Sequence, residues 1–179
     1  MTTHVEARRY RPEDGSELTA LLNTAYRQLQ DQGLNFTAAT QDVETTRQRV
    51  AEGVCWVVEH DGCVAASMTM SVPAPAEIRS LSEHAREPST GWLSQVAVGP
   101  ELRGRSVAKT LFDVACEWAI AHGITTIRLD TAAPAKHLVT MYTRWGFAHV
   151  DDVHFPGKNY DSVVMTRGVL GQPDNEASH

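Results

Sequence analysis

The sequence predicts a mixed α/β (α+β) domain, with a central sheet of about six or seven strands flanked by about four helices. Two observations lead to this prediction. Seven segments have the composition of strands, and four others carry apolar residues at helical spacing. Their order is strand, two helices, three strands, helix, strand, helix and two strands, which lacks the regular alternation of a doubly wound fold.

The first half of the chain supplies the predicted hairpin. Residues 5–11 form the first expected strand, and Pro12 with two acidic residues starts a helix. A loop over 33–40 precedes a second helix, over 40–52, which Gly53 closes. Strands are expected at 55–59 and 63–72, because Asp61-Gly62 between such runs is typical of a hairpin turn. Residues 73–91 are expected to form a long loop with one short helix near 78–85.

The second half alternates strands with helices. Strands are expected at 92–98, 126–131, 147–153 and 162–166. A helix over 106–122 is expected to bury one face, made of Val107, Leu111, Val114, Ala115, Trp118 and Ala119. Another helix begins at Pro134 and ends at Gly146. We expect residues 1–170 to form a single domain and residues 171–179 a disordered tail.

Composition argues against several classes of partner. The chain of 179 residues has a formal net charge of −6, and nucleic acid and anionic membranes both favour a basic surface. We therefore expect neither as a partner. The sequence has no run of 18 apolar residues and no apolar N-terminal segment typical of a signal peptide. Its three cysteines are odd in number and lack metal-ligand spacing, which favours a reducing cytoplasm.

The central motif is a turn between a strand and a helix. Gln95-Val96-Ala97-Val98 leads into Arg103-Gly104-Arg105-Ser106-Val107-Ala108, and the next helix ends in Tyr142-Thr143-Arg144-Trp145-Gly146-Phe147. Backbone N–H groups at such a helix start favour phosphate. In this order, the motifs resemble the GNAT acyltransferase superfamily. The resemblance implies the GNAT fold from about residue 5 to 166, and acetyl-CoA as cosubstrate, with no metal.

The resemblance also implies which residues bind coenzyme A. Backbone N–H groups of Arg103, Gly104, Arg105, Ser106, Val107 and Ala108 would hold the pyrophosphate, and Lys109 would add a charge. Val96, Ala97 and Val98 would pair through their backbone with pantetheine, where their strand separates from the next. A strand N–H would polarise the acyl carbonyl. A polar turn and a solvated lysine are the alternative interpretations.

Two positions depart from the pattern of the family. Ser106 stands where glycine is usual, because backbone must approach phosphate closely there. The serine hydroxyl is able to donate to phosphate or to cap the helix. Ala135 stands where many members place an asparagine that contacts the pantetheine arm.

Tyr142 is the expected catalytic residue. The resemblance implies that its phenol, with an ordinary pKa of about 10, protonates the coenzyme A sulfur as this group leaves. An aromatic core residue is the alternative interpretation. No cysteine lies in a motif of a nucleophile, so direct attack by the amine in a ternary complex is expected.

The general base has no motif of its own. Candidates by residue type are Glu77, His84, Glu87, His149, Asp152 and His154, and a water chain near Ser94 and Gln95 is another option. Strand alternation would place His149 with Asp151 on one face and Asp152 with His154 on the other, which argues against a metal site. The resemblance implies that Tyr26, Phe36 and residues 73–91 build the acceptor pocket.

The sequence thus predicts a cytoplasmic N-acetyltransferase that uses acetyl-CoA and acts on a primary amine of a small molecule or peptide. A catalytically silent sensor that binds acyl-CoA is the alternative. A nucleotide-phosphate binder is disfavoured, because no Lys-Ser or Lys-Thr follows the turn. The amine itself and the oligomeric state, including a homodimer, stay open.

Overall fold

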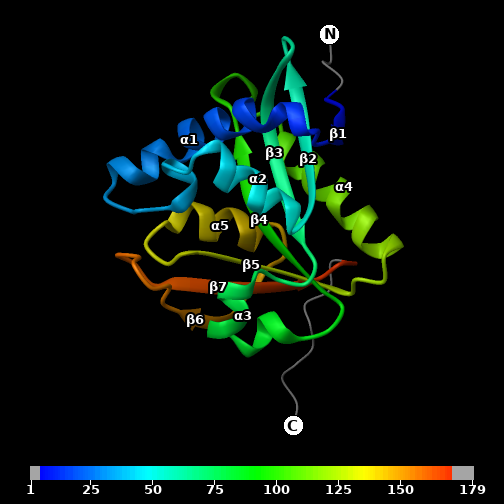
Figure 1. Cartoon of the computed structure of the whole chain (residues 1–179). Helices are drawn as coiled ribbons and strands as arrows, with labels where there is room; N and C mark the ends of the chain where they lie inside the picture. The colour runs from blue at the N-terminus through cyan, green and yellow to red at the C-terminus, as the bar shows by residue number, and fades with distance from the viewer. Residues whose placement is uncertain (1–4, 171–179) are drawn as a thin grey trace.

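A computed structural model describes residues 5–170 and has a seven-stranded mixed sheet, in the order β1-β2-β3-β4-β5-β7-β6 (Figure 1). The predicted α/β class is therefore confirmed. The predicted tail, residues 171–179, lies outside the described residues. The elements are β1 (Ala7–Arg9), α1 (Gly15–Asp31), α2 (Val43–Ala51), β2 (Gly53–His60), β3 (Cys63–Ser71), α3 (Ala76–Leu81), β4 (Thr90–Val98), α4 (Val107–Ala121), β5 (Thr126–Ala132), α5 (Lys136–Arg144), β6 (Ala148–Val153) and β7 (Ser162–Gly168).

Helices cover both faces of the sheet. On one face, Leu111 of α4 and Tyr142 of α5 pack in one apolar cluster with Ile127 and Leu129 of β5. On the other face, α1 packs against β2 and β3, and Ile78 of α3 packs further along the sheet. Because strand side chains alternate, Arg128 and Asp130, the residues on either side of Leu129 in β5, point to the opposite face of the sheet from Ile127 and Leu129. The alternation therefore places two charged side chains of β5 on the same face of the sheet.

The predicted hairpin is present, and the second predicted helix, α2, begins at a side-chain cap. Asp61 and Gly62 have φ values of 51° and 78° between β2 and β3. Two consecutive left-handed residues are typical of the tight turn that matches the twist of paired strands. At the start of α2, the Asp42 side chain accepts a hydrogen bond of 2.8 Å from the backbone N–H of Thr45. The cap satisfies one of the N–H groups that a helix start leaves unpaired.

Strands β4 and β5 are paired over only part of their length. They run parallel and pair from Thr90–Leu93 to Thr126–Leu129, and no pairing continues beyond Leu93. Within the unpaired part of β4, Gln95 has a left-handed φ of 51°, and the register against β3 shifts between Ser67 and Thr69. A bulge of this kind bends its strand and ends the pairing. The backbone of β4 beyond Leu93 is therefore unpaired on the side that faces β5.

Several sequence predictions need correction. Residues 73–91 hold α3 and a separate short turn, and β4 begins at Thr90 rather than at Trp92. Residues 33–40, which were expected to form a loop, contain a 3-10 turn at Thr37–Ala39. In α4, Phe112 is buried, whereas the predicted face residues Val114 and Trp118 are only partly buried. Apolar spacing defines a stripe, but tertiary packing decides its width.

The predicted alternation along β6 is wrong. The register against β7 shifts between His149 and Asp151, so the strand contains a bulge. An extra residue reverses the faces beyond it. As a result, Nε2 of His149 lies 3.0 Å from Oδ1 of Asp152, the residue expected on the opposite face. Residues 5–170 contain no group of three or more His, Cys, Asp or Glu that could hold a metal ion.

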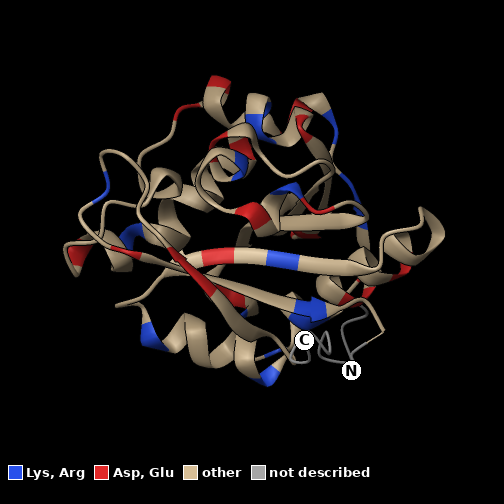
Figure 2. Ribbon diagram, turned by 90° about the horizontal axis from the view of Figure 1, so that it is seen from below, with Lys and Arg blue, Asp and Glu red and all other residues tan. Residues whose placement is uncertain are grey.

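Charges are interspersed along the ribbon. Figure 2 shows acidic and basic positions scattered over helices and strands, so neither sign is confined to one element. In the described part of the chain, no helix is both long and apolar enough to cross a membrane. All three cysteines are free thiols, with Cys55 buried, Cys63 exposed and Cys116 partly buried.

Candidate active site

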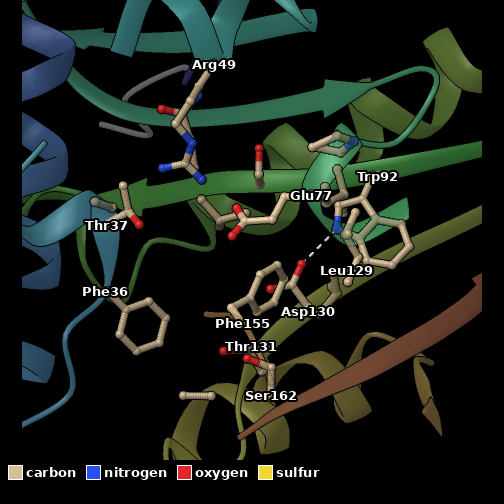
Figure 3. A pocket seen from close by; sticks show the side chains of 18 of the residues that line it. Phe36, Thr37, Arg49, Glu77, Trp92, Leu129, Asp130, Thr131, Phe155 and Ser162 are labelled. Atoms are coloured by element: carbon tan, nitrogen blue, oxygen red, sulfur yellow. Dashed lines mark hydrogen bonds between the residues drawn. The ribbon is translucent and has the colours of Figure 1, made fainter. Parts of the chain in front are cut away.

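A cavity of about 350 Å³ opens where β4 and β5 separate. Its walls come from Leu93–Val96 of β4, Leu129–Ala132 of β5, the start of α3, the segment 36–38, and side chains of α1, α2 and α5. Figure 3 shows charged and aromatic side chains from these elements pointing into the same space. The splayed pair of strands therefore creates a site that distant segments of the chain complete.

Aromatic rings form one wall of this cavity. Phe36 stacks on Tyr160 with centroids 5.1 Å apart, and it contacts Tyr26 at 5.5 Å. Tyr26 and Phe36 line the cavity, and of the segment 73–91, which was expected to contribute to the acceptor pocket, residues 75–78 line it. The hydroxyl of Tyr26 donates a hydrogen bond of 2.9 Å to the carbonyl of Val96, and burial raises the pKa of this phenol to about 12. Tyr26 therefore fixes the unpaired stretch of β4 from the side of α1.

The turn after β4 has the features of an anion site. Gly104 has a φ of 75°, and Ser106 adopts the left-handed region with φ 56° and ψ 24°. Arg103 and Arg105 are exposed beside it. Among the hydrogen bonds of residues 5–170, none uses the backbone N–H of Ser106, Val107 or Ala108. These N–H groups stand at the positive end of α4, where an anion is favoured.

The conformation of Ser106 explains why glycine is usual at this position. A side chain in the left-handed region costs about 1–2 kcal/mol, which glycine avoids. The hydroxyl makes no capping hydrogen bond, so the helix-cap role considered for it is absent in this structure. Lys109 is exposed and forms an ion pair with Asp113 one turn later.

The predicted coenzyme-binding residues lie in two neighbouring regions. Val96 lines the cavity, whereas the side chains of Ala97 and Val98 pack in apolar clusters. The turn from Arg103 to Lys109 does not line the cavity but continues from the same strand. Ala135, the second departure, is buried at the start of α5.

Tyr142 lies in α5 and lines the cavity. Its ring makes edge-on contacts with Trp145 at 5.6 Å and Phe147 at 6.0 Å, which fix its direction. Burial raises the pKa of its phenol well above 10, and the charges of Tyr26 and Asp130 act in the same direction. The hydroxyl is therefore protonated at neutral pH and able to donate.

Asp130 is the polar residue that sequence reasoning missed. It lies on β5 and lines the cavity, and its Oδ1 accepts a hydrogen bond of 2.9 Å from Nε1–H of Trp92. Burial raises the pKa of this carboxyl, against the effects of the Trp92 hydrogen bond and the Arg49 charge. A carboxyl with a raised pKa in a cavity is typical of a functional group.

A sequence signal for Asp130 did exist. Arg128 and Asp130 alternate with the apolar Ile127 and Leu129, a pattern typical of a strand with one solvated face. Residues 84–87, which follow α3, cover Arg128 instead: its guanidinium donates to the carbonyl of His84 at 2.6 Å, and the residue is only 2% exposed. Two charges on one strand face beneath a predicted loop were the available clue.

The candidate bases named from the sequence differ in whether they line the cavity. Glu77 lines the cavity, as do Ser94 and Gln95. His84 lies 3.0 Å from Glu87, which pairs with Arg128 at 2.7 Å. His149 pairs with Asp152, and His154 lies 2.9 Å from Asp161. Of the six candidate bases, only Glu77 lines the cavity, and the other five, His84, Glu87, His149, Asp152 and His154, do not.

Comparisons with known proteins agree with this geometry. A sequence model of the acetyltransferase (GNAT) family matches residues 18–147. Two proteins of Bacillus subtilis are similar along most of their length. The S-(2-succino)cysteine N-acetyltransferase is 26% identical over 159 residues, 86% of this chain and 90% of that protein. The S-alkylcysteine N-acetyltransferase is 25% identical over 162 residues, 88% of this chain and 85% of that protein.

A solved structure shows the same fold. The ribosomal-protein-S18-alanine N-acetyltransferase from Escherichia coli has a TM-score of 0.69 at 13% identity, over 98% of this chain and 99% of that chain. The family match spans α1 to Phe147 and so includes the splayed strands, the turn and Tyr142. The chain therefore belongs to the GNAT family of acetyl-CoA-dependent N-acetyltransferases.

Proposed function

We propose that this protein transfers the acetyl group of acetyl-CoA to the primary amine of a small molecule, by direct attack in a ternary complex. The observation that carries the proposal is the cavity between β4 and β5, which is lined both by the protonated phenol of Tyr142 from α5 and by the carboxyl of Asp130 from β5. The names of the two Bacillus relatives make S-substituted cysteines the first acceptors to test.

The residues present fit coenzyme A. Within the turn predicted from Arg103 to Ala108, the N–H groups of Arg103 and Arg105 already donate to the carbonyls of Pro100 and Leu102, both at 3.3 Å. Pyrophosphate would therefore be held by the N–H groups of Gly104, Ser106, Val107 and Ala108, and the phosphates would also attract Lys109 if it leaves Asp113. The open backbone edge of Val96, Ala97 and Val98 would accept pantetheine as a peptide adds to a sheet. When bound, acetyl-CoA supplies an acetyl group on a thiol leaving group.

Tyr142 and Asp130 have complementary roles in this proposal. An acceptor amine is mostly ammonium at neutral pH and must lose a proton before it attacks. Asp130, with its raised pKa, takes that proton on a carboxylate oxygen. Tyr142, with its raised pKa, keeps its proton until it donates to the leaving sulfur. The raised pKa makes the Asp130 carboxylate a stronger base, and the raised pKa of Tyr142 keeps its phenol protonated as the acid.

The proposal is tested by thiol release from acetyl-CoA across a panel of amines. The panel contains S-(2-succino)cysteine, S-methylcysteine and a peptide with a free N-terminal alanine, with a reaction lacking amine as the control. We expect release with at least one small-molecule amine, and an N-acetylated product by mass spectrometry. Acetyl-CoA binding by calorimetry without release on any amine would instead support the sensor.

A further inference from the structure

Two cations line the acceptor side of the cavity. Arg49 projects from α2, and Lys158 comes from the segment between β6 and β7. Nζ of Lys158 donates to the carbonyl of Asn35 at 2.7 Å and to Oγ1 of Thr37 at 2.9 Å. Both cations are half-buried, so they are partly removed from the water that would solvate them.

Neither cation is neutralised by an acidic side chain. Within residues 5–170, no carboxylate lies within ion-pair distance of Arg49 or Lys158. Burial lowers the pKa of Lys158, Glu77 opposes this shift, and the Arg49 charge adds to it. Two like charges facing one enclosed space are unfavourable until an anion enters it. Glu52, Glu77 and Asp130 also line the cavity, but none of them lies within ion-pair distance of either cation, so both cations keep donors for an anionic group of a ligand.

A hydrogen bond to a buried glutamine orients the guanidinium of Arg49. Its Nη1 donates a hydrogen bond of 2.7 Å to Oε1 of Gln41, a side chain only 6% exposed. Nε2 of Gln41 in turn donates to Oγ1 of Thr46 at 2.7 Å and to Oε1 of Gln95 at 3.2 Å. Gln95 is the bulged residue of β4, so a buried hydrogen-bond network links Arg49 to the open strand edge.

Acidic side chains line the same space. Figure 3 shows Arg49, Glu77 and Asp130 directed into the cavity, with Asp130 next to Trp92. The pKa of Asp130 responds to the charges of both Arg49 and Glu77, which places all three within electrostatic reach. A ligand with one positive and one negative group would match this separation of charge.

We propose that Arg49 and Lys158 bind the carboxylate of the acceptor, while Asp130 and Glu77 face its ammonium group. The acceptor is then an amino acid rather than a simple amine or the N-terminus of a long peptide. This inference rests on the proposed acetyl transfer, because it names the acceptor for that reaction. Of the two cations, Arg49 is expected to contribute more to carboxylate binding than Lys158, since a guanidinium binds a carboxylate through two parallel hydrogen bonds.

Matched acceptors test the proposal. S-methylcysteine and 2-(methylthio)ethylamine differ by the carboxylate alone, and both are compared in steady-state kinetics. We expect wild-type protein to favour S-methylcysteine in kcat/KM by about ten- to hundredfold, the usual value of a hydrogen-bonded charge. Arg49→Gln should remove most of that preference by raising KM for S-methylcysteine, with KM for acetyl-CoA unchanged.

A control variant and a binding measurement make the outcomes distinct. Arg27→Gln changes an exposed arginine of α1 that does not line the cavity, and it should leave the preference intact. Calorimetry of S-methylcysteine binding to the protein with coenzyme A should show weaker binding in Arg49→Gln than in Arg27→Gln. Thermal melting confirms that both variants fold, and Lys158→Gln serves as a second variant.

The inference and the proposed function fail in different ways. Equal use of both acceptors by the wild type, with Arg49→Gln affecting them alike, would overturn the carboxylate site and leave acetyl transfer standing. Absence of turnover on every amine would count against the function. In that case calorimetry still decides the site: binding lost only in Arg49→Gln supports it, and unchanged or undetectable binding overturns it.

Discussion

Nε1–H of Trp92 donates a hydrogen bond of 2.9 Å to Oδ1 of Asp130 across the parallel strands β4 and β5. The two residues lie near the point where the pairing of these strands ends. The indole fixes one carboxylate oxygen, so the carboxyl has a defined direction at the cavity wall. The Trp92 contact therefore positions the group to which we assign proton transfer.

Asp130→Asn should lower kcat/KM for the amine by about 10²-fold, a typical loss for a general base. The wild-type rate should fall as the pH falls through the raised pKa of Asp130, because protonation removes the base. The variant should lack this step. Rates measured from pH 5 to 9 test it, with Asp31→Asn, an exposed residue at the end of α1, as the control.

The same variant should not be less stable. Because burial raises the pKa of Asp130, the ionised carboxyl destabilises the folded state; this cost grows as the pH rises from the ordinary carboxyl pKa of about 4 to the raised value and is fully present above it. Asparagine removes the charge and still accepts from Trp92. Thermal melting at pH 8 should give an equal or higher Tm, and a marked fall would mean that the ionised form stabilises the fold.

Tyr142→Phe should lower kcat by about 10²–10⁴-fold without weakening acetyl-CoA binding. Phenylalanine keeps the edge-on contacts with Trp145 and Phe147, so the change removes the hydroxyl alone. The raised pKa of the wild-type phenol also predicts no loss of rate from its ionisation below pH 10. Stopped-flow turnover and calorimetry measure these effects, and unchanged turnover would contradict the role.

Ser106 allows a test of backbone strain in the anion-binding turn. Its φ of 56° favours glycine, so Ser106→Gly should raise the free energy of unfolding by about 0–1 kcal/mol and retain coenzyme A binding. Ser106→Val should lower it by about 1–2 kcal/mol, because a branched side chain suits this region poorly. Chemical denaturation of the two variants and the wild type measures these differences in the free energy of unfolding. Equal stability of both variants would mean that the turn is not left-handed in solution.

Asp14 links the start of α1 to the first strand. Its carboxylate accepts hydrogen bonds of 2.8 and 2.9 Å from Arg8 and one of 2.7 Å from the backbone N–H of Arg11. Arg8 lowers the pKa of Asp14, although burial opposes the shift. Asp14→Asn should therefore cost about 1–3 kcal/mol near neutral pH.

The pH dependence of that cost follows from the direction of the shift. A lowered pKa stabilises the fold above the ordinary carboxyl pKa of about 4, and the contribution is lost as the pH falls through the lowered value. The difference in stability between wild type and Asp14→Asn should thus shrink in acid. Glu13→Gln, its exposed neighbour, should show no comparable difference at either pH.

Local signals predicted the elements well, but long-range packing decided the site. The Asp61-Gly62 turn and the helix expected over 106–122 depend on neighbours in sequence, so they could be predicted. The alternation of Arg128 and Asp130 with apolar residues indicates a polar strand face, but the enclosure of that face depends on residues 75–87, about 50 residues earlier, which the alternation does not show. The bulge in β6 is similar, because an alternating sequence does not show where a residue is skipped.

The turn and Tyr142 could be named from the sequence because their motif is local. Arg49 and Lys158 could not, since one lies in a helix and the other in a loop about a hundred residues away. Only the folded chain brings them to one cavity. The donor side was thus accessible to motif reasoning, whereas the acceptor side required the structure.

The initial rate of thiol release from acetyl-CoA with S-methylcysteine tests the central claim most directly. We predict amine-dependent release by the wild type, with stoichiometric N-acetylated product, and a rate reduced by at least about 10²-fold in Tyr142→Phe. Calorimetry should show that both proteins bind acetyl-CoA equally. Equal rates in the two proteins would contradict the assignment of the cavity between β4 and β5 as the site of transfer.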